Sequence, residues 1–140
     1  MNRPEQKIQT AIVVALRRRF DCFPFHVPNG GARTRLEAIA FKDAGTTAGV
    51  PDLPVLGRDG SIFFLEIKAK VQVRERNVPP TERIHSCDPA QKLVIADFRA
   101  RGFTVAIVDS VEDAVAVAEA CGLTEVRKPI RSQAAISTGF

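Results

Sequence analysis

The chain has 140 residues, 45% of them hydrophobic, and a formal net charge of +4. This length suits one domain with its own core, and the basic excess mildly favours anionic partners. No apolar run is long enough to cross a bilayer, and no secretory signal pattern opens the chain, so we expect no membrane association. Three scattered cysteines argue against a disulfide framework and favour a reducing cytoplasm.

The first third of the chain is predicted to form a helix, a strand and a second helix. Residues 4–20 are predicted to be helical, because apolar residues recur every four positions. Residues 22–27 are predicted to form a short strand, which its proline places at an edge of the sheet. Residues 35–43 are predicted as a short helix capped by Thr34, and its basic residues lie on a face that is either solvated or in contact with DNA.

A β-hairpin is predicted around residues 57–60. A three-residue loop would place Gly60 in the left-handed conformation that glycine adopts cheaply. Gly57 would then face Ser61, and counting back along both strands puts Asp52 opposite Glu66. Opposed residues share a face of the sheet, so the two carboxylates are expected to converge.

Asp52, Glu66 and Lys68 are candidate site residues on one face of this hairpin, because residues two apart on a strand point the same way. Two close carboxylates repel unless a cation lies between them, and hard oxygen ligands suit Mg²⁺ or Mn²⁺. A neighbouring lysine can orient a water nucleophile or stabilise charge on a phosphate. The alternative is a solvated strand face on which Glu66 and Lys68 form a surface charge pair.

Residues 70–87 are basic and lack a regular period, so we expect a loop or protruding arm there. An arm beside the site is a candidate DNA contact through Arg74 and Arg76. His85 and Cys87 lie close in sequence, but without a second pair of ligands a plain loop is favoured over a zinc site.

The remainder of the chain is predicted to contain a helix, a strand, a helix and a tail. Asp88 and Gln91 form the pattern of a capping box at the start of a helix. Residues 103–108 read as a buried strand, parallel to the second strand of the hairpin. A last helix runs to Cys121, and residues 124–140 are expected to be a mobile tail.

This order of elements resembles the PD-(D/E)xK nuclease superfamily, whose restriction-endonuclease-like α/β core is a mixed four-stranded sheet flanked by helices (α-β-β-β-α-β). More narrowly, the chain resembles stand-alone members of the VRR-NUC family over residues 5–118, and residues 1–123 would form the nuclease domain. The matching motifs are Glu5 with Ile8-Gln9, residues 27–33, Ala48-Gly49-Val50-Pro51-Asp52-Leu53, Glu66-Ile67-Lys68 and Pro89-Ala90-Gln91.

The resemblance implies roles for individual residues. Asp52, Glu66, the backbone carbonyl of Ile67 and Glu5 would bind Mg²⁺ or Mn²⁺. Lys68 would position the attacking water, and Gln91 would order the site from its helix. The candidate DNA contacts, from the resemblance or from local charge, are Asn29, Arg33, Arg35, Arg74 and Arg76.

The expected function is that of a metal-dependent DNA endonuclease that hydrolyses phosphodiester bonds. Similarity to Holliday-junction resolvases implies selectivity for four-way or other branched DNA and a homodimer. It also implies a role in DNA repair, in the cytoplasm of a bacterium or of a phage-infected host. The alternative is a non-catalytic nucleic-acid-binding module on the same fold. A sequence-specific restriction enzyme is less expected, because no target-recognition domain is evident.

Overall fold

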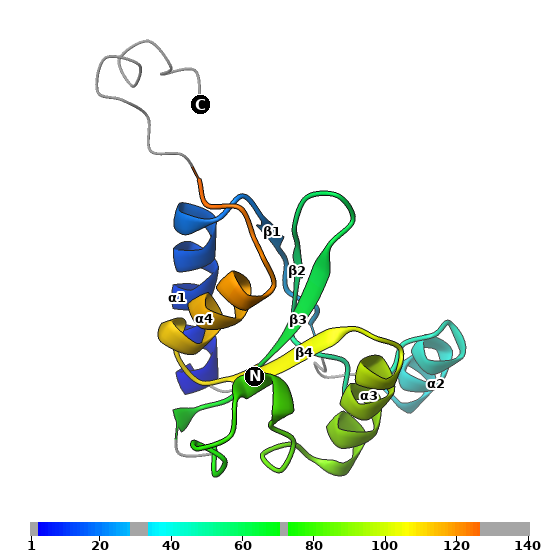
Figure 1. Ribbon diagram of the computed structural model, residues 1–140. Helices are drawn as coiled ribbons and strands as arrows, with labels where there is room; N and C mark the ends of the chain where they lie inside the picture. The colour runs from blue at the N-terminus through cyan, green and yellow to red at the C-terminus, as the bar shows by residue number, and fades with distance from the viewer. Residues whose placement is uncertain (1–2, 29–33, 71–72, 127–140) are drawn as a thin grey trace.

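A mixed sheet lies at the centre of the computed structural model, which describes residues 3–28, 34–70 and 73–126 (Figure 1). Its four strands are β1 (Phe23–Pro24), β2 (Leu53–Leu56), β3 (Ile62–Ile67) and β4 (Thr104–Val108), in that spatial order. β2 pairs antiparallel with both β1 and β3, whereas β3 and β4 are parallel. The predicted mixed four-stranded sheet is confirmed.

Helices alternate with these strands in the predicted order. They are α1 (Arg3–Arg19), α2 (Arg35–Asp43), α3 (Pro89–Ala100) and α4 (Val111–Ala120), with a short 3-10 helix, η2 (Pro80–Glu82). Three of the four α-helices begin at a side-chain cap: Thr34, Asp88 and Ser110 each accept a hydrogen bond from the amide three residues on. These caps satisfy amide groups that would otherwise lack partners at a helix start.

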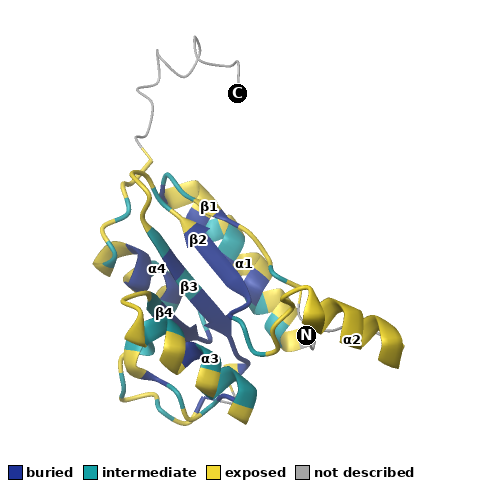
Figure 2. Cartoon of the chain, turned by 90° about the vertical axis from the view of Figure 1, so that its right-hand side faces the viewer, coloured by how far each residue is buried: buried dark blue, intermediate teal, exposed yellow. Residues whose placement is uncertain are grey.

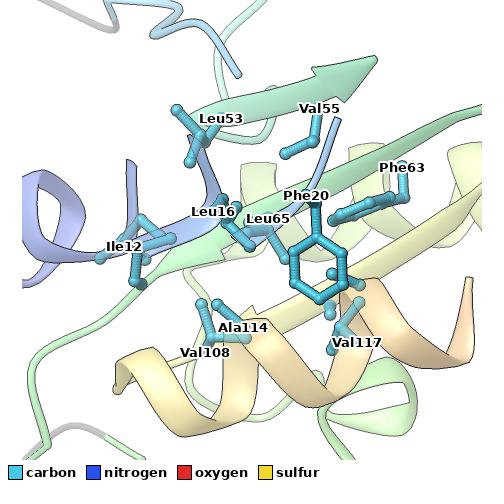
Figure 3. Packing of buried hydrophobic residues seen from close by; sticks show 13 residues of the cluster. Ile12, Leu16, Phe20, Leu53, Val55, Phe63, Leu65, Val108, Ala114 and Val117 are labelled. Atoms are coloured by element: carbon cyan, nitrogen blue, oxygen red, sulfur yellow. The ribbon is translucent and has the colours of Figure 1, made fainter. Parts of the chain in front are cut away.

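The main core lies between one face of the sheet and the pair α1 and α4. Figure 3 shows Leu16 of α1, and Phe20 just after this helix, meeting Leu65 of β3 and Val117 of α4, and all four are buried. Side chains alternate between the two faces along a strand. Residues next to the buried Leu53 and Leu65, which are Asp52 and Glu66, therefore face the other side.

The second face of the sheet is covered by α3. Ile95 of α3 is fully buried against Val105 and Ile107 of β4. Phe98 packs edge-on against Phe64 of β3, with ring centroids 5.0 Å apart. In contrast, α2 has no buried residue and projects from the body (Figure 2).

The hairpin between β2 and β3 has the predicted register. Leu53 lies opposite Leu65, and the Gly57 amide donates to the Ser61 carbonyl at 2.9 Å. Gly60 has the expected positive φ of 77°, and Asp59 shares it with a φ of 57°. Two successive left-handed residues match the twist of the paired strands, which holds the register.

The described part of residues 70–87 is a loop with one short 3-10 helix, so the first of the two expectations is met and that of a protruding arm is not. Arg83 is only 5% exposed, and its guanidinium donates to the Ile107 carbonyl at 3.1 Å and to Asp113 at 2.8 Å. Arg99 also donates to the outer edge of β4, at the Val105 carbonyl. The loop is therefore folded back on β4 through Arg83. Arg83 of the loop and Arg99 of α3 together bond carbonyl groups on the edge of β4 that does not pair with β3.

Two other boundaries differ from the predictions. β1 is limited to two residues, because Pro54 of β2 accepts the Phe25 amide at 3.0 Å but has no amide proton to donate back, although the Val27 amide still donates to the Asp52 carbonyl at 2.8 Å. The expected tail from residue 124 is paired at its start: the Asp21 amide donates to the Thr124 carbonyl, and the Val126 amide to that of Arg19. Residues 127–140 lie outside the described part of the chain.

Candidate active site

Asp52 links β1, β2 and β3 immediately before β2 begins. Its backbone carbonyl accepts the Val27 amide at 2.8 Å and lies 3.2 Å from His26 Nδ1. Its side-chain Oδ2 accepts the Ile67 amide at 2.9 Å. These bonds fix the carboxylate at the end of the sheet where β3 ends.

Glu66 is a buried acid with one unsatisfied oxygen. Its exposed fraction is 1%, and Oε2 accepts Gln91 Nε2 at 3.1 Å. Oε1 is buried and has no hydrogen-bond partner within the described residues. Burial first, and then the negative charge of Asp52, raise the pKa of Glu66 to about 10, and Lys68 opposes this shift. The carboxylate pair is thus costly to ionise unless a cation compensates it.

Lys68 and Gln91 complete a polar network around this acid. Lys68 is 8% exposed, and its Nζ donates to Gln91 Oε1 at 2.9 Å. The same Gln91 oxygen accepts the Asp88 amide at 3.0 Å, which closes the capping box of α3. The predicted helix-start role of Gln91 is therefore confirmed, and its side chain also contacts the acid and the lysine.

Gly49 holds the segment before Asp52 against the start of α3. Its φ is +89°, and a Cβ there would lie 2.7 Å from the Ala90 carbonyl carbon and oxygen. A side chain cannot fit without moving backbone. This close approach helps to keep Gln91 within hydrogen-bonding distance of Glu66.

The oxygen-rich site suits a hard divalent cation better than zinc. Asp52 and Glu66 offer carboxylate oxygens, one of them without a donor, and magnesium sites are commonly built on one or two carboxylates with water. Within the described residues no three His, Cys, Asp or Glu side chains gather closely enough to hold a metal ion. The protein therefore supplies a two-carboxylate site, to which backbone oxygen and water would add further ligands.

The other predicted site residues begin with Glu5 of α1. Glu5 is partly buried in the first turn of α1. Both Figure 1 and Figure 2 put the N-terminal end of α1 at the end of the sheet where β3 ends. Its role as a metal ligand stays a prediction. Asn29 and Arg33 lie outside the described residues, and Arg35 and Arg74 are exposed.

Asp109 was not anticipated, and Gln9 was named only as part of a motif. Asp109 follows β4 and is 3% exposed; its Oδ2 lies 3.0 Å from Arg76 Nη1 as an ion pair and accepts no hydrogen bond within the described residues. Gln9 is 9% exposed, and its Oε1 has no hydrogen-bond partner in the described part of the chain. The only sequence signal for Asp109 is its place after an apolar run, where parallel strands commonly carry functional residues.

The zinc alternative finds no support in the geometry. Cys87 is buried in the core beneath α3, and this burial raises the pKa of its thiol to about 11, whereas His85 is exposed. None of the described helices has both the length and the apolar character needed to traverse a lipid bilayer.

The sheet and its flanking helices define an α/β domain with a mixed four-stranded sheet and a polar network at one end of it. The fold is similar to that of a VRR_NUC domain. A solved structure described as a VRR_NUC domain protein matches with a TM-score of 0.56 and 22% sequence identity, covering 87% of this chain and 90% of that chain. No protein-family model matches the sequence, and comparison with curated proteins finds no match.

Proposed function

We propose that this protein is a Mg²⁺- or Mn²⁺-dependent endonuclease that hydrolyses phosphodiester bonds in DNA, with a preference for branched substrates such as four-way junctions. The observation that carries the proposal is the buried Glu66–Asp52 pair, whose unsatisfied Oε1 lies within a network that also contains Lys68 and Gln91. The VRR_NUC-like fold supports a nuclease-type domain.

Asp52 and Glu66 would hold the metal together with the Ile67 carbonyl, and Glu5 would have to approach from α1 to join them. A bound divalent cation lowers the pKa of a coordinated water and offsets charge on the phosphate in the transition state. The cation would also offset the burial and the repulsion by Asp52 that make Glu66 hard to ionise. The protein contributes a rigid carboxylate pair, since the Ile67 amide and Gln91 already fix one oxygen of each acid.

Lys68 would act on the nucleophile and on the phosphate. Its ammonium group is largely buried and held by Gln91 Oε1, so it has few alternative positions. A fixed cation aimed at developing negative charge lowers the barrier without having to reorganise. Gln91 would be a positioning residue, because it contacts both Lys68 and Glu66.

A cleft of about 690 Å³ offers DNA an approach to this network. It runs between α2 and the start of α3, with Lys42 and Thr47 on one side and Gln91 on the other. Exposed Arg35, at the start of α2, adds positive charge near this side of the molecule. Selectivity for a junction would require two such sites, one per subunit of a homodimer, so that two strands are cut symmetrically.

Cleavage of labelled DNA tests the proposal. A four-way junction, a matched duplex and a single strand are incubated with Mn²⁺, with Mg²⁺ or with EDTA, using wild type, Glu66→Gln and Lys68→Ala. We expect paired symmetric nicks in the junction that require metal and fall by about 10²–10³-fold in each variant. Arg101→Gln, at the far end of α3, is the control that should cut like wild type.

Each other outcome has a definite meaning. Metal-dependent cutting of duplex or single strand alone would keep the nuclease and remove the junction preference. DNA binding without cutting, under every metal condition, would replace the proposal with a non-catalytic DNA-binding module.

A further inference from the structure

We propose that Arg76 contacts a DNA phosphate beside the candidate site, and that the buried Asp109 holds Arg76 in position for this contact. This inference rests on the proposed function and deepens it by assigning a positioning role to Asp109. The starting observation is an ion pair with very unequal exposure: the Arg76 side chain is 54% exposed, and that of Asp109 is 4% exposed, with Nη1 3.0 Å from Oδ2.

Asp109 lies at the same end of the sheet as Lys68. β3 and β4 are parallel, with Ile67 beside Val108, so Lys68 and Asp109 are the next residues on the two neighbouring chains. The Lys68 amide donates to the Val108 carbonyl at 2.9 Å, which continues the ladder to this point. The carboxyl ends of parallel strands are a common location for ligand sites.

Arg76 spans the two chain segments that leave these strands. Its Nη1 contacts Asp109 after β4, and its Nη2 donates to the Lys70 carbonyl, two residues after Lys68. A guanidinium has five N–H donors, of which the bond to Lys70 uses one. The contact with Asp109 is an ion pair in which Oδ2 accepts no hydrogen bond from the described part of the chain. More than half of the side chain still faces solvent, so a phosphate can reach it while both contacts persist.

The neighbouring arginines of the loop do not have this combination. Arg83 is buried and bonded to Asp113 and to backbone carbonyls of the loop and of β4, so it has a structural role. Arg74 is exposed and lacks a partner among the described residues. A buried acid that fixes an exposed cation lowers the entropy that the side chain loses on binding. Arg76 is therefore the cation of this loop suited to holding the DNA strand beside the scissile phosphate.

The direction in which one substitution changes DNA affinity distinguishes this positioning role from an effect of net charge. Asp109→Asn removes a negative charge, which by charge alone strengthens DNA binding. If Asp109 positions Arg76, the same change weakens binding, because the arginine loses its anchor. Arg76→Lys keeps the charge but cannot span Asp109 and the Lys70 carbonyl with two amino groups.

Binding is measured by fluorescence anisotropy with a labelled four-way junction and a matched duplex, in EDTA, over a series of salt concentrations. We expect Arg76→Gln to weaken binding several-fold and to reduce the salt slope by about 0.9 on duplex, the value of one phosphate contact. Asp109→Asn and Arg76→Lys should each weaken binding, and in the Arg76→Gln background Asp109→Asn should no longer weaken it. The exposed pair Arg101 and Asp97 provides matched controls, Arg101→Gln and Asp97→Asn.

Stability measurements accompany each variant. Unchanged or tighter binding in Asp109→Asn, with a folded protein by circular dichroism, would overturn the positioning role. Should Asp109→Asn fail to fold, Arg76→Lys decides, and wild-type affinity there would reject the proposal. A wild-type protein that binds no DNA at all would remove the proposed function as well, so the two failures are distinguishable.

Discussion

Gln91 donates its side-chain amide to Glu66 across 3.1 Å, which joins the cap of α3 to the buried acid of β3. The same side chain closes the capping box with Asp88 and accepts Lys68 Nζ. A single amide therefore serves helix stability and the candidate site together. Substitutions at the two ends of the capping box can separate these contributions.

Gln91→Ala is expected to reduce both stability and cleavage. It removes the partner of Lys68, the donor to Glu66 and the return bond of the cap, at a cost of about 1–3 kcal/mol in the free energy of unfolding. Asp88→Ala is the matched control, because it removes the cap acceptor at a cost of about 0.5–2 kcal/mol and leaves both site contacts in place. Urea denaturation and cleavage rates measure the two effects. Equal losses of cleavage in both variants would show that Gln91 acts only as a cap.

The stability of the metal-free protein is expected to fall as pH rises through the neutral range. The pKa of Glu66 is raised from 4.5 to about 10 in the folded protein, so between these values the folded state holds a proton that the unfolded state has lost. Stability then decreases with increasing pH over this window. Thermal unfolding in EDTA from pH 5 to pH 9 measures the slope.

Glu66→Gln should flatten this dependence, because glutamine does not titrate. A divalent cation should also stabilise the wild-type protein, and most strongly at the alkaline end, since it binds the ionised acid pair of the folded state. The same melting temperature for wild type and Glu66→Gln at every pH, with and without Mn²⁺, would contradict both the buried acid and the metal site.

Gly49→Ala is expected to destabilise the protein and slow cleavage. Alanine at a φ of +89° costs about 1–2 kcal/mol, and contact with the Ala90 backbone adds about 1–3 kcal/mol from overpacking. Gly45→Ala is the control, since its φ is +99° but a Cβ there meets nothing within 4 Å. Differential scanning calorimetry compares them. If the two variants have the same melting temperature, the close approach to α3 does not contribute to stability.

Arg83→Met is expected to loosen the loop between β3 and α3. It strips the Ile107 and Val78 carbonyls of a donor and leaves Asp113 without its partner, a change that costs about 3–5 kcal/mol where such pairs are buried. Arg74→Met, at an exposed position, should leave stability near that of wild type. Limited proteolysis followed by mass spectrometry should find new cleavage within residues 73–87 in the first variant only. Equal resistance in both would show that Arg83 does not anchor the loop.

The parts of the fold that sequence predicted are those set by local chemistry. The register that places Asp52 opposite Glu66 depends on the turn after Gly57, and the start of α3 depends on the residues from Asp88 to Gln91. Neighbours in sequence determine both, so a pattern of residues is enough to find them. The Gln91 side chain that closes this cap also contacts Glu66 and Lys68, so the helix start and the candidate site share one residue.

The parts that sequence did not predict depend on partners far along the chain. Arg83 appeared to be one of several surface cations, but it bonds Ile107, 24 residues later. Asp109 forms an ion pair with Arg76, which lies on a loop with no periodic pattern. The Thr124 carbonyl accepts a hydrogen bond from the Asp21 amide, about a hundred residues earlier in the chain. Charge and composition cannot distinguish such residues from solvated ones, because only the tertiary fold supplies the partner.

The arginine bonds along the outer edge of β4 also limit how copies of this protein can associate. Arg83 and Arg99 occupy the Ile107 and Val105 carbonyls, which are the groups a fifth strand would need. A continuous sheet running through two subunits at this edge would have to break those bonds and expose a buried guanidinium. An assembly that keeps these bonds intact therefore cannot form by strand-to-strand extension of β4.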